Sequence, residues 1–372
     1  MRIAIDITRA IIENAGIGRY SFEISQKMID QGTEDHFLIY STHFRDDEEK
    51  QKKFNSFKRK NVELKRLKIP GKVKEILWGL KLDFLKKFLD DSEVLFAPSF
   101  FEVGLGFKIP QVVAIHDMTH FLFPDQRGVR LSRYLSKRTL DVLKIAKKVI
   151  CISNSTRKDV LKLSKVNPEI VEIIYPGRKI FSKIAGVLPN NLKKDSYILS
   201  VGTIEPRKNL TGLFEAYSRL GEKLQQQYPL VVAGGRGWNE GKIFEKLKEL
   251  NLQNKVIFTG FVEDEILARL YTDCKIFIYP SLYEGFGLPV LEAMSFGAPT
   301  ITSNISSMPE VIGDAGILVD PKNPEQISKA IEALISQDKI RNDLSKKALI
   351  KSLNFSWDFA AQETLDLIKS AK

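Results

Sequence analysis

Residues 275–299 read KIFIYPSLYEGFGLPVLEAMSFGAP, and this stretch indicates the class of fold. The run KIFIY is short and apolar, which is typical of a strand buried on both faces of a parallel sheet. A glycine-containing loop follows, and Pro289 suits the first position of a helix because its missing N–H would have no partner there. A strand, a loop and a helix therefore follow one another, as in one unit of an α/β sheet.

The same alternation extends through the whole chain of 372 residues. Short runs rich in Val and Ile alternate with amphipathic segments such as 209–220 and 263–271. This order predicts two doubly wound α/β domains, because one core seldom organises so many residues. We expect strands at 2–7, 36–40, 62–67, 94–98, 111–115, 149–153 and 171–175 in the first domain, and at 197–201, 230–233, 256–260, 276–279, 299–302 and 316–319 in the second.

The domain boundary is predicted within 176–195, where the polar segment GVLPNNLKKD precedes a new strand. We expect an N-terminal domain over residues 1–185 and a C-terminal domain over residues 186–355. The last segment, 356–372, predicts an amphipathic helix with Ser356 as its N-cap and Asp358 in its first turn.

The composition predicts a soluble globular protein with a basic excess, because 43% of the residues are hydrophobic and the formal net charge is +11. The excess lies in 45–90 and 125–150. Within 65–89, basic residues interleave with Leu, Ile, Phe and Trp78, as in helices that lie on an anionic bilayer, although a solvated lysine-rich face explains the pattern equally well. The first residues, MRIAIDITRA, do not resemble a secretory signal, and we expect a cytoplasmic location with possible association with the inner face of the membrane.

The two cysteines, Cys151 and Cys274, each lie in an apolar run, KKVICIS and DCKIFIYP. A thiol in such a run behaves as a small hydrophobic side chain. We therefore expect two buried free thiols and no disulfide framework.

Two carboxylates and a glycine loop form the first candidate site. The loop 284–288 lies at the carboxyl end of a predicted strand and at the start of a helix, where α/β sheets bind ligands and free N–H groups favour anions. Glu284 and Glu292 flank it, and such carboxylates are good acceptors for sugar hydroxyls. Taken alone they would equally be a surface acid and a helix-dipole partner, but the glycines and the proline between them favour a binding role.

Arg207 and Lys208 form the second candidate site, within ILSVGTIEPRKNLTGLFEAY at 198–217. They follow another predicted strand and precede a helix, so they can neutralise a diphosphate. A basic pair before a helix is otherwise ordinary solvated surface. Its place on the same sheet edge as the glycine loop favours the binding role.

Two weaker signals lie in the N-terminal domain. Gly16 and Gly18 precede a predicted helix and suit a loop that approaches a phosphate or an acceptor, but a dinucleotide fingerprint would need a third glycine where Ser21 stands. His116 follows an apolar strand, where it has either a ligand-facing or a structural role. His116 and His120 lack a third ligand, so we expect no metal there.

These motifs resemble those of the retaining glycosyltransferases of family four, which have the GT-B architecture. The stretches EGFGLPVLEAM and VGTIEPRKNL are the most specific, and AGIGRYSFEI, AIHDMTHFLFP, ICISNSTRKDV, IIYPG and FTGFVEDEILARLY follow the order that the family uses. The resemblance implies two Rossmann-like domains that face each other across a cleft, with the helix at 356–372 packing back on the N-terminal domain. It also implies transfer of a hexose, with mannose favoured, in polysaccharide or lipopolysaccharide biosynthesis.

The resemblance assigns roles to individual residues. Glu292 would bind the ribose of a nucleotide-sugar, and the transferred sugar and phosphates would be held by Glu284 and the backbone of Gly285, Phe286, Gly287 and Leu288. Arg207 and Lys208 would stabilise the diphosphate, with support from Gly16 and Gly18. His116 would contact the donor sugar. The nucleobase would contact the backbone of Phe261 and Val262. The expected catalytic residues are His116, Glu284, Lys208 and Arg207.

One departure concerns the turn after the VG of 201–202. Many relatives carry arginine directly after this glycine, whereas this chain has Thr203. Arg207 is expected to supply that charge from a different position, as in an EPRKN subgroup found among mannosyltransferases.

The predicted mechanism needs no metal and no other cofactor. The chain has no Asp-x-Asp motif, so Lys208, Arg207 and the helix N-terminus are expected to stabilise the leaving diphosphate. Retention by double displacement needs a carboxylate nucleophile, for which Asp117 is only a weak candidate. We therefore favour a front-face substitution in which the leaving phosphate helps to deprotonate the acceptor.

The expected donor is GDP-mannose, with UDP-glucose or a rhamnose nucleotide as alternatives, and the expected acceptor is a saccharide or a lipid-linked saccharide. A nucleotide-sugar epimerase of similar build is the alternative enzyme. A nucleic-acid-binding protein would account for the net charge, but the basic segments match no nucleic-acid motif and the glycine loop would have no role, so we expect no nucleic-acid partner.

Overall fold

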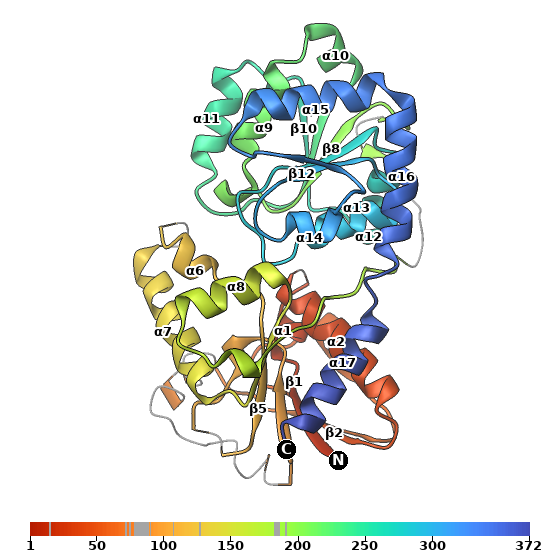
Figure 1. Ribbon diagram of the computed structural model, residues 1–372. Coiled ribbons are helices and arrows are strands. Elements are labelled where there is room, and N and C mark those ends of the chain that lie inside the picture. Colours follow the sequence, from red (N-terminus) through yellow and green to blue (C-terminus); the bar gives the residue numbers. More distant parts are fainter. Residues whose placement is uncertain are drawn as a thin grey trace. The chain divides into compact units, whose positions relative to one another are not determined.

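The computed structural model describes residues 1–14, 16–70, 73, 76–77, 89, 91–106, 108–125, 128–181, 187–189 and 192–372. The chain forms two compact units (Figure 1). The first consists of Met1–Pro124, Gly128–Gly177 and Ser356–Lys372, and the second consists mainly of Arg178–Phe355. The chain leaves the first unit after Gly177, whereas the sequence predicts that the N-terminal domain extends to residue 185.

The first unit is built on a parallel sheet with the strand order β3-β2-β1-β4-β5-β6-β7. Its central strands are buried along their whole length, as expected for a parallel sheet covered by helices on both faces. Each strand that the sequence predicts in this unit is present, with ends that differ by a few residues. The strands are β1 (Arg2–Asp6), β2 (His36–Ser41), β3 (Val62–Arg66), β4 (Val94–Ala97), β5 (Gln111–Ile115), β6 (Lys148–Cys151) and β7 (Val171–Ile173).

The helices of the first unit include the C-terminal segment of the chain. Helix α17 (Trp357–Ser370) begins at Ser356, whose Oγ accepts a hydrogen bond from the Asp358 N–H at 3.1 Å. It lies beside α2, and Lys27 Nζ of α2 is 2.9 Å from Asp358 Oδ1 (Figure 1). The other helices are α1 (Thr8–Ile12), α2 (Ile17–Gln31), α3 (Glu48–Asn55), η1 (Phe100–Glu102), α6 (Thr119–Leu122), α7 (Val129–Ile145), α8 (Asn154–Leu163) and η2 (Pro168–Ile170).

The segment that follows His116 begins a short helix rather than a loop. The short helix α6 occupies 119–122. Its first turn is started by Asp117, whose Oδ1 accepts a hydrogen bond from the Thr119 N–H at 2.8 Å.

The second unit is built on a parallel sheet with the order β10-β9-β8-β11-β12-β13. Its strands again match the predicted segments: β8 (Ile198–Val201), β9 (Leu230–Ala233), β10 (Val256–Gly260), β11 (Ile276–Tyr279), β12 (Thr300–Ser303) and β13 (Ile317–Val319). The helices are η4 (Pro206–Lys208), α9 (Leu210–Ser218), α10 (Glu222–Gln227), α11 (Gly241–Glu249), α12 (Asp264–Asp273), α13 (Leu288–Ser295), α14 (Met308–Ile312), α15 (Pro324–Ser336) and α16 (Asp338–Ser352).

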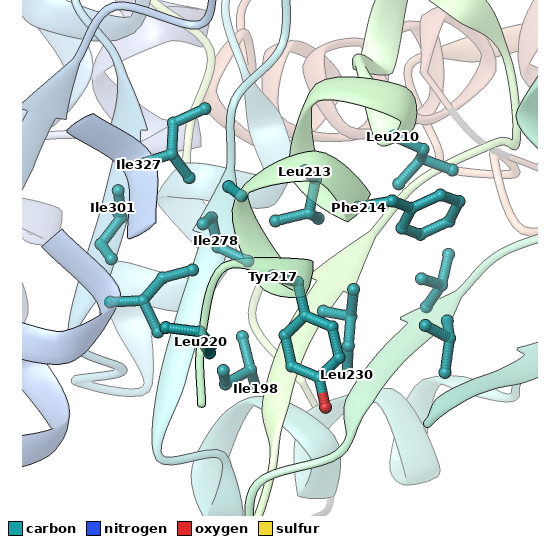
Figure 2. Close-up of a cluster of buried hydrophobic side chains, with 14 of the residues drawn as sticks. Ile198, Leu210, Leu213, Phe214, Tyr217, Leu220, Leu230, Ile278, Ile301 and Ile327 are labelled. Atoms are coloured by element: carbon teal, nitrogen blue, oxygen red, sulfur yellow. The ribbon is translucent and has the colours of Figure 1, made fainter. Parts of the chain in front are cut away.

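The core of the second unit fixes the strands and helices that carry the site. Figure 2 shows Leu213 and Tyr217 of α9 among buried isoleucines of the sheet, including Ile198 of β8 and Ile278 of β11. Burying one such side chain contributes about 1.5–3 kcal/mol, so this packing holds α9 firmly against β8 and β11. The segments that leave these two strands at their carboxyl ends are thereby held in place.

The two cysteines are buried and free, as predicted. Burial raises the pKa of the Cys151 thiol to about 12, and burial also raises the pKa of the Cys274 thiol. Both thiols therefore stay protonated and act as core side chains.

Candidate functional site

The two motifs of the C-terminal domain meet at one edge of the second sheet. Strands β8 and β11 are parallel neighbours in this sheet. The chain leaves β8 through Gly202 and reaches η4 with Arg207 and Lys208, and it leaves β11 through the loop that holds Glu284. Because the carboxyl ends of parallel strands share an edge, the cations and the carboxylate are brought together, as predicted.

Glu284 lies at the centre of a nearly buried cluster of charges. Its Oε1 is 2.6 Å from Lys208 Nζ and its Oε2 is 2.7 Å from Arg207 Nη1. Arg207 also pairs with Glu205 through Nη2. The side chains of Lys208, Arg207 and Glu284 are only 12%, 13% and 11% exposed. The negative charges of the two glutamates therefore neutralise the positive charges of the arginine and the lysine, in a nearly buried place where an unpaired charge would be costly.

Neutral groups complete the surroundings of Glu284. The hydroxyls of Ser281 and Tyr279 lie 2.7 Å and 2.9 Å from its Oε1. Its backbone N–H donates to Ser306 Oγ at 3.0 Å, and the Ser306 hydroxyl lies 2.6 Å from its carbonyl oxygen. The loop and the side chain are thus both fixed before any ligand arrives.

The charges in this cluster shift the pKa of its members. Burial acts to raise the pKa of Glu284, but the charges of Arg207 and Lys208 and the hydrogen bonds outweigh it and lower this pKa to about 2. Burial and the neighbouring Arg207 lower the pKa of Lys208, against the attraction of Glu284. Glu284 is therefore a stable anion and a weak base.

The glycine loop has the backbone form that its sequence requires. Gly287 has φ = +101° and immediately precedes α13. A Cβ atom at this position would lie 2.2 Å from Cε of Met308. The end of the Met308 side chain could move aside, but at this φ any other residue would strain the backbone, so the turn between Gly285 and Leu288 depends on glycine here.

Glu292 has surroundings quite different from those of Glu284. It lies within α13, is 4% exposed, and its Oε2 accepts a hydrogen bond from the Tyr271 hydroxyl at 3.0 Å. Phe261 and Val262, which follow β10, also lie at the carboxyl edge of this sheet, and Phe261 is exposed.

The remaining predicted residues belong to the first unit. Gly16 has φ = +55° and immediately precedes α2. The sequence predicts that Gly18 also precedes this helix, but Gly18 lies within its first turn. A Cβ atom on Gly18 would lie 2.2 Å from the Glu13 carbonyl oxygen, so close packing alone explains this glycine.

His116 is buried at the carboxyl end of β5. Its Nε2 lies 2.7 Å from the Pro98 carbonyl oxygen, and its ring meets Tyr20 edge to face. Burial lowers the pKa of His116, although the Pro98 carbonyl and Asp117 oppose this. The ring is therefore neutral, and its Nε2–H donates a hydrogen bond to the Pro98 carbonyl. These contacts fix the orientation of the His116 ring, and its contact with the donor sugar stays a prediction.

The cluster also contains residues that the sequence predictions miss. Glu205 belongs to the EPRKN motif, but the motif alone predicts no role for it. Tyr279 ends an apolar strand and has the sequence pattern of a core residue. Asn209, at φ = +57°, donates from Nδ2 to the carbonyls of Pro280 and Pro321 at 3.1 and 2.7 Å, which ties η4 to the neighbouring loops.

The described residues form neither a metal-ion cluster nor a membrane-spanning helix. Among these residues, no group of three or more His, Cys, Asp or Glu side chains is arranged to hold a metal ion. No helix in the described part of the chain combines the length and the apolar character needed to cross a membrane.

Comparison with known proteins defines the class to which this fold and cluster belong. Residues 188–350 match the family described as Glycosyl transferases group 1, and residues 14–179 match Glycosyltransferase Family 4. The chain is 33% identical over 278 residues to O-antigen chain mannosyltransferase B of Escherichia coli, covering 72% of this chain and 73% of that protein. The chain belongs to this family of glycosyltransferases and is similar to its mannosyltransferases.

Two further similarities extend this assignment. The chain is 40% identical over 216 residues to the serotype-specific mannosyltransferase WbdA of Escherichia coli; the match covers 57% of this chain and 26% of WbdA, about a quarter of its length. The crystal structure of HepE from Anabaena in complex with UDP and glucose superimposes with a TM-score of 0.76 at 18% identity, covering all of both chains. The two Rossmann-like units thus have the α/β fold of GT-B glycosyltransferases.

Proposed function

We propose that the protein transfers mannose from GDP-mannose to a saccharide or a lipid-linked saccharide, with retention of anomeric configuration and without a metal ion. The observation that carries this proposal is the cluster of Lys208, Arg207 and Glu284 at the carboxyl edge of β8 and β11. The names of the mannosyltransferase relatives support mannose, and the UDP in HepE supports a nucleotide-sugar donor.

In this proposal the two cations stabilise the negative charge that develops on the departing diphosphate. When the bond between the anomeric carbon and the phosphate oxygen breaks, its electron pair stays on that oxygen. Lys208 and Arg207 are already held by Glu284, so they need little reorganisation to stabilise that charge. Glu292 would accept hydrogen bonds from the ribose hydroxyls, and Gly285, Phe286 and Leu288 would lie along the sugar and phosphates.

The surroundings of Glu284 favour front-face substitution over double displacement. A nucleophile or general base must offer electron density, but both oxygens of Glu284 contact cations and its pKa is lowered to about 2. In the proposed step the acceptor oxygen bonds to the anomeric carbon on the side from which the diphosphate leaves. The acceptor proton passes to the departing phosphate oxygen, so no protein base is required.

A donor panel tests this function. The protein would be incubated with GDP-mannose, UDP-glucose or dTDP-rhamnose and a mannose-containing oligosaccharide, with EDTA present or absent. We expect a new α-mannoside from GDP-mannose, at equal rates with and without EDTA. A β-mannoside from GDP-mannose would contradict retention, and dependence on added metal would contradict the metal-free mechanism. Conversion of a donor to a new nucleotide-sugar without any acceptor would indicate the epimerase alternative instead.

We also propose that the first unit contacts an anionic membrane surface. Most of the basic segment 65–89 lies outside the described residues, but the basic segment 125–150 contains α7. On α7 the exposed side chains of Arg130, Arg133 and Lys137 alternate with those of Leu131 and Tyr134. Such a face suits an interface of acyl chains and anionic headgroups.

Vesicle sedimentation tests the membrane proposal. We expect the protein to sediment with phosphatidylglycerol vesicles but not with phosphatidylcholine vesicles, and the double variant Arg130→Glu/Arg133→Glu to sediment less. Equal sedimentation of this variant and the wild type would contradict a role for α7.

A further inference from the structure

Tyr279, the last residue of β11, joins the two charged groups at the centre of the site. Lys208 Nζ donates a hydrogen bond to its hydroxyl at 2.6 Å, and the same hydroxyl donates to Glu284 Oε1 at 2.9 Å. The side chain is fixed, because it is 2% exposed and its ring stacks on that of Phe277 with 6.0 Å between the centroids. The hydroxyl is therefore held at one place between an ammonium group and a carboxylate.

Packing in the core of the sheet does not require the Tyr279 hydroxyl. The rest of β11 is apolar, and a phenylalanine would fill the same volume without burying an oxygen. A buried hydroxyl is costly unless it is hydrogen-bonded. Here its partners are the charged groups of Lys208 and Glu284, and hydrogen bonds to charged groups are the stronger kind. The hydroxyl therefore belongs to the charge cluster.

These contacts determine how the ammonium group of Lys208 is oriented. A lysine has three N–H donors on a flexible chain. One donor is directed to Glu284 and a second to Tyr279, which fixes the direction of the third.

We propose that Tyr279 is a positioning residue, whose hydroxyl holds the ammonium group of Lys208 in the orientation that stabilises the leaving diphosphate. The inference rests on the proposed function, in which Lys208 meets that diphosphate. It adds a residue that acts through Lys208 and that needs no contact with the donor itself.

The Tyr279 hydroxyl also affects the pH dependence of transfer. Lys208 faces Arg207, Glu284, Glu205 and the Tyr279 hydroxyl. Burial and Arg207 already lower the pKa of Lys208. Removing the hydroxyl takes an acceptor from the charged form, so it lowers this pKa further. The high-pH loss of kcat then begins at a lower pH.

The test compares Tyr279→Phe with the wild type and with Tyr197→Phe. Tyr197 is also buried in the second unit, but it stands at the amino end of β8 and its hydroxyl donates to the Leu270 carbonyl at 2.8 Å. The kcat, the KM for the donor and the pH profile of kcat are measured with the donor that the wild type uses best among GDP-mannose, UDP-glucose and dTDP-rhamnose. Thermal unfolding checks that each variant folds.

We expect Tyr279→Phe to lose about tenfold or more in kcat, the size expected for lost hydrogen bonds to charged groups, with a smaller change in KM. Its high-pH limb should shift to lower pH. Tyr197→Phe should keep the wild-type kcat and pH profile even if its unfolding temperature falls. An unchanged kcat and profile in Tyr279→Phe, or equal effects of both variants, would overturn the inference while leaving the proposed function intact. A wild type that transfers no sugar from any of the three donors would overturn the proposed function, and this inference with it.

Discussion

Glu284 and Glu292 belong to one motif, yet the structure gives them opposite surroundings. Glu284, on the loop after β11, contacts two cations and two hydroxyls. Glu292, within α13, accepts a hydrogen bond from the neutral Tyr271 hydroxyl. The first carboxylate therefore holds two cations in place, whereas the second is suited to exchange hydrogen bonds with neutral hydroxyls, such as those of a ribose.

Removing Lys208, one of the two cation partners of Glu284, should have the largest effect on catalysis. We expect Lys208→Ala to lower kcat by about 100-fold or more, because a preorganised donor to the leaving group is lost. Steady-state transfer assays check this. Lys246→Ala is the matched control, since Lys246 pairs with Glu215 and Glu249 on the surface of the same unit and its loss should leave kcat unchanged. Equal kcat values for Lys208→Ala and the wild type would contradict the diphosphate role.

The same comparison predicts a difference in stability. Glu284→Gln leaves Lys208 and Arg207 without their shared counter-charge, and we expect it to lower the free energy of unfolding by about 3 kcal/mol. Glu292→Gln keeps an acceptor for Tyr271 and should cost no more than about 1 kcal/mol. Urea unfolding measures both. A larger loss for Glu292→Gln than for Glu284→Gln would reverse our comparison.

Glu292→Ala should act on donor binding. Because its proposed contact is with the ribose, present in both the ground state and the transition state, we expect about a tenfold rise in KM for the donor with kcat nearly unchanged. An unchanged KM together with a reduced kcat would show that Glu292 acts in the chemical step.

Acid stability should also distinguish Glu284 from Glu292. The pKa of Glu284 is lowered from 4.5 to about 2, so the carboxylate stabilises the folded protein fully above pH 4.5, and this stabilisation is lost as the pH falls towards 2. We expect Glu284→Gln to show a weaker dependence of unfolding free energy on pH across this window than Glu292→Gln does. Identical pH profiles of the two variants would contradict the strong ion pairing of Glu284.

The sequence predicts the sheets well because parallel strands buried on both faces appear as short apolar runs. The strand from Ile276 to Tyr279 is an example, with predicted and observed bounds that agree. Arg207, Lys208 and Glu284 could also be predicted to meet, since each follows a strand and parallel strands end at one edge. Neither inference needs details of side-chain packing.

Other features depend on tertiary contacts that no local pattern records. Tyr279 ends an apolar run, and only the approach of Lys208 and Glu284 shows that its hydroxyl belongs to the site. His116 stands at a strand end where ligands often bind, but its partner is the Pro98 carbonyl, distant in sequence. The pairing of Glu284 with both cations likewise requires the loops in their folded positions.

We claim that Lys208 binds the terminal phosphate of a nucleoside diphosphate, and calorimetric titration of GDP and GMP measures this binding. We predict that the wild type binds GDP at least about tenfold more tightly than GMP, as expected for a hydrogen bond to a charged group. This preference should disappear in Lys208→Ala and persist in Glu292→Ala. A Lys208→Ala variant that keeps the full preference for GDP over GMP would contradict the claim.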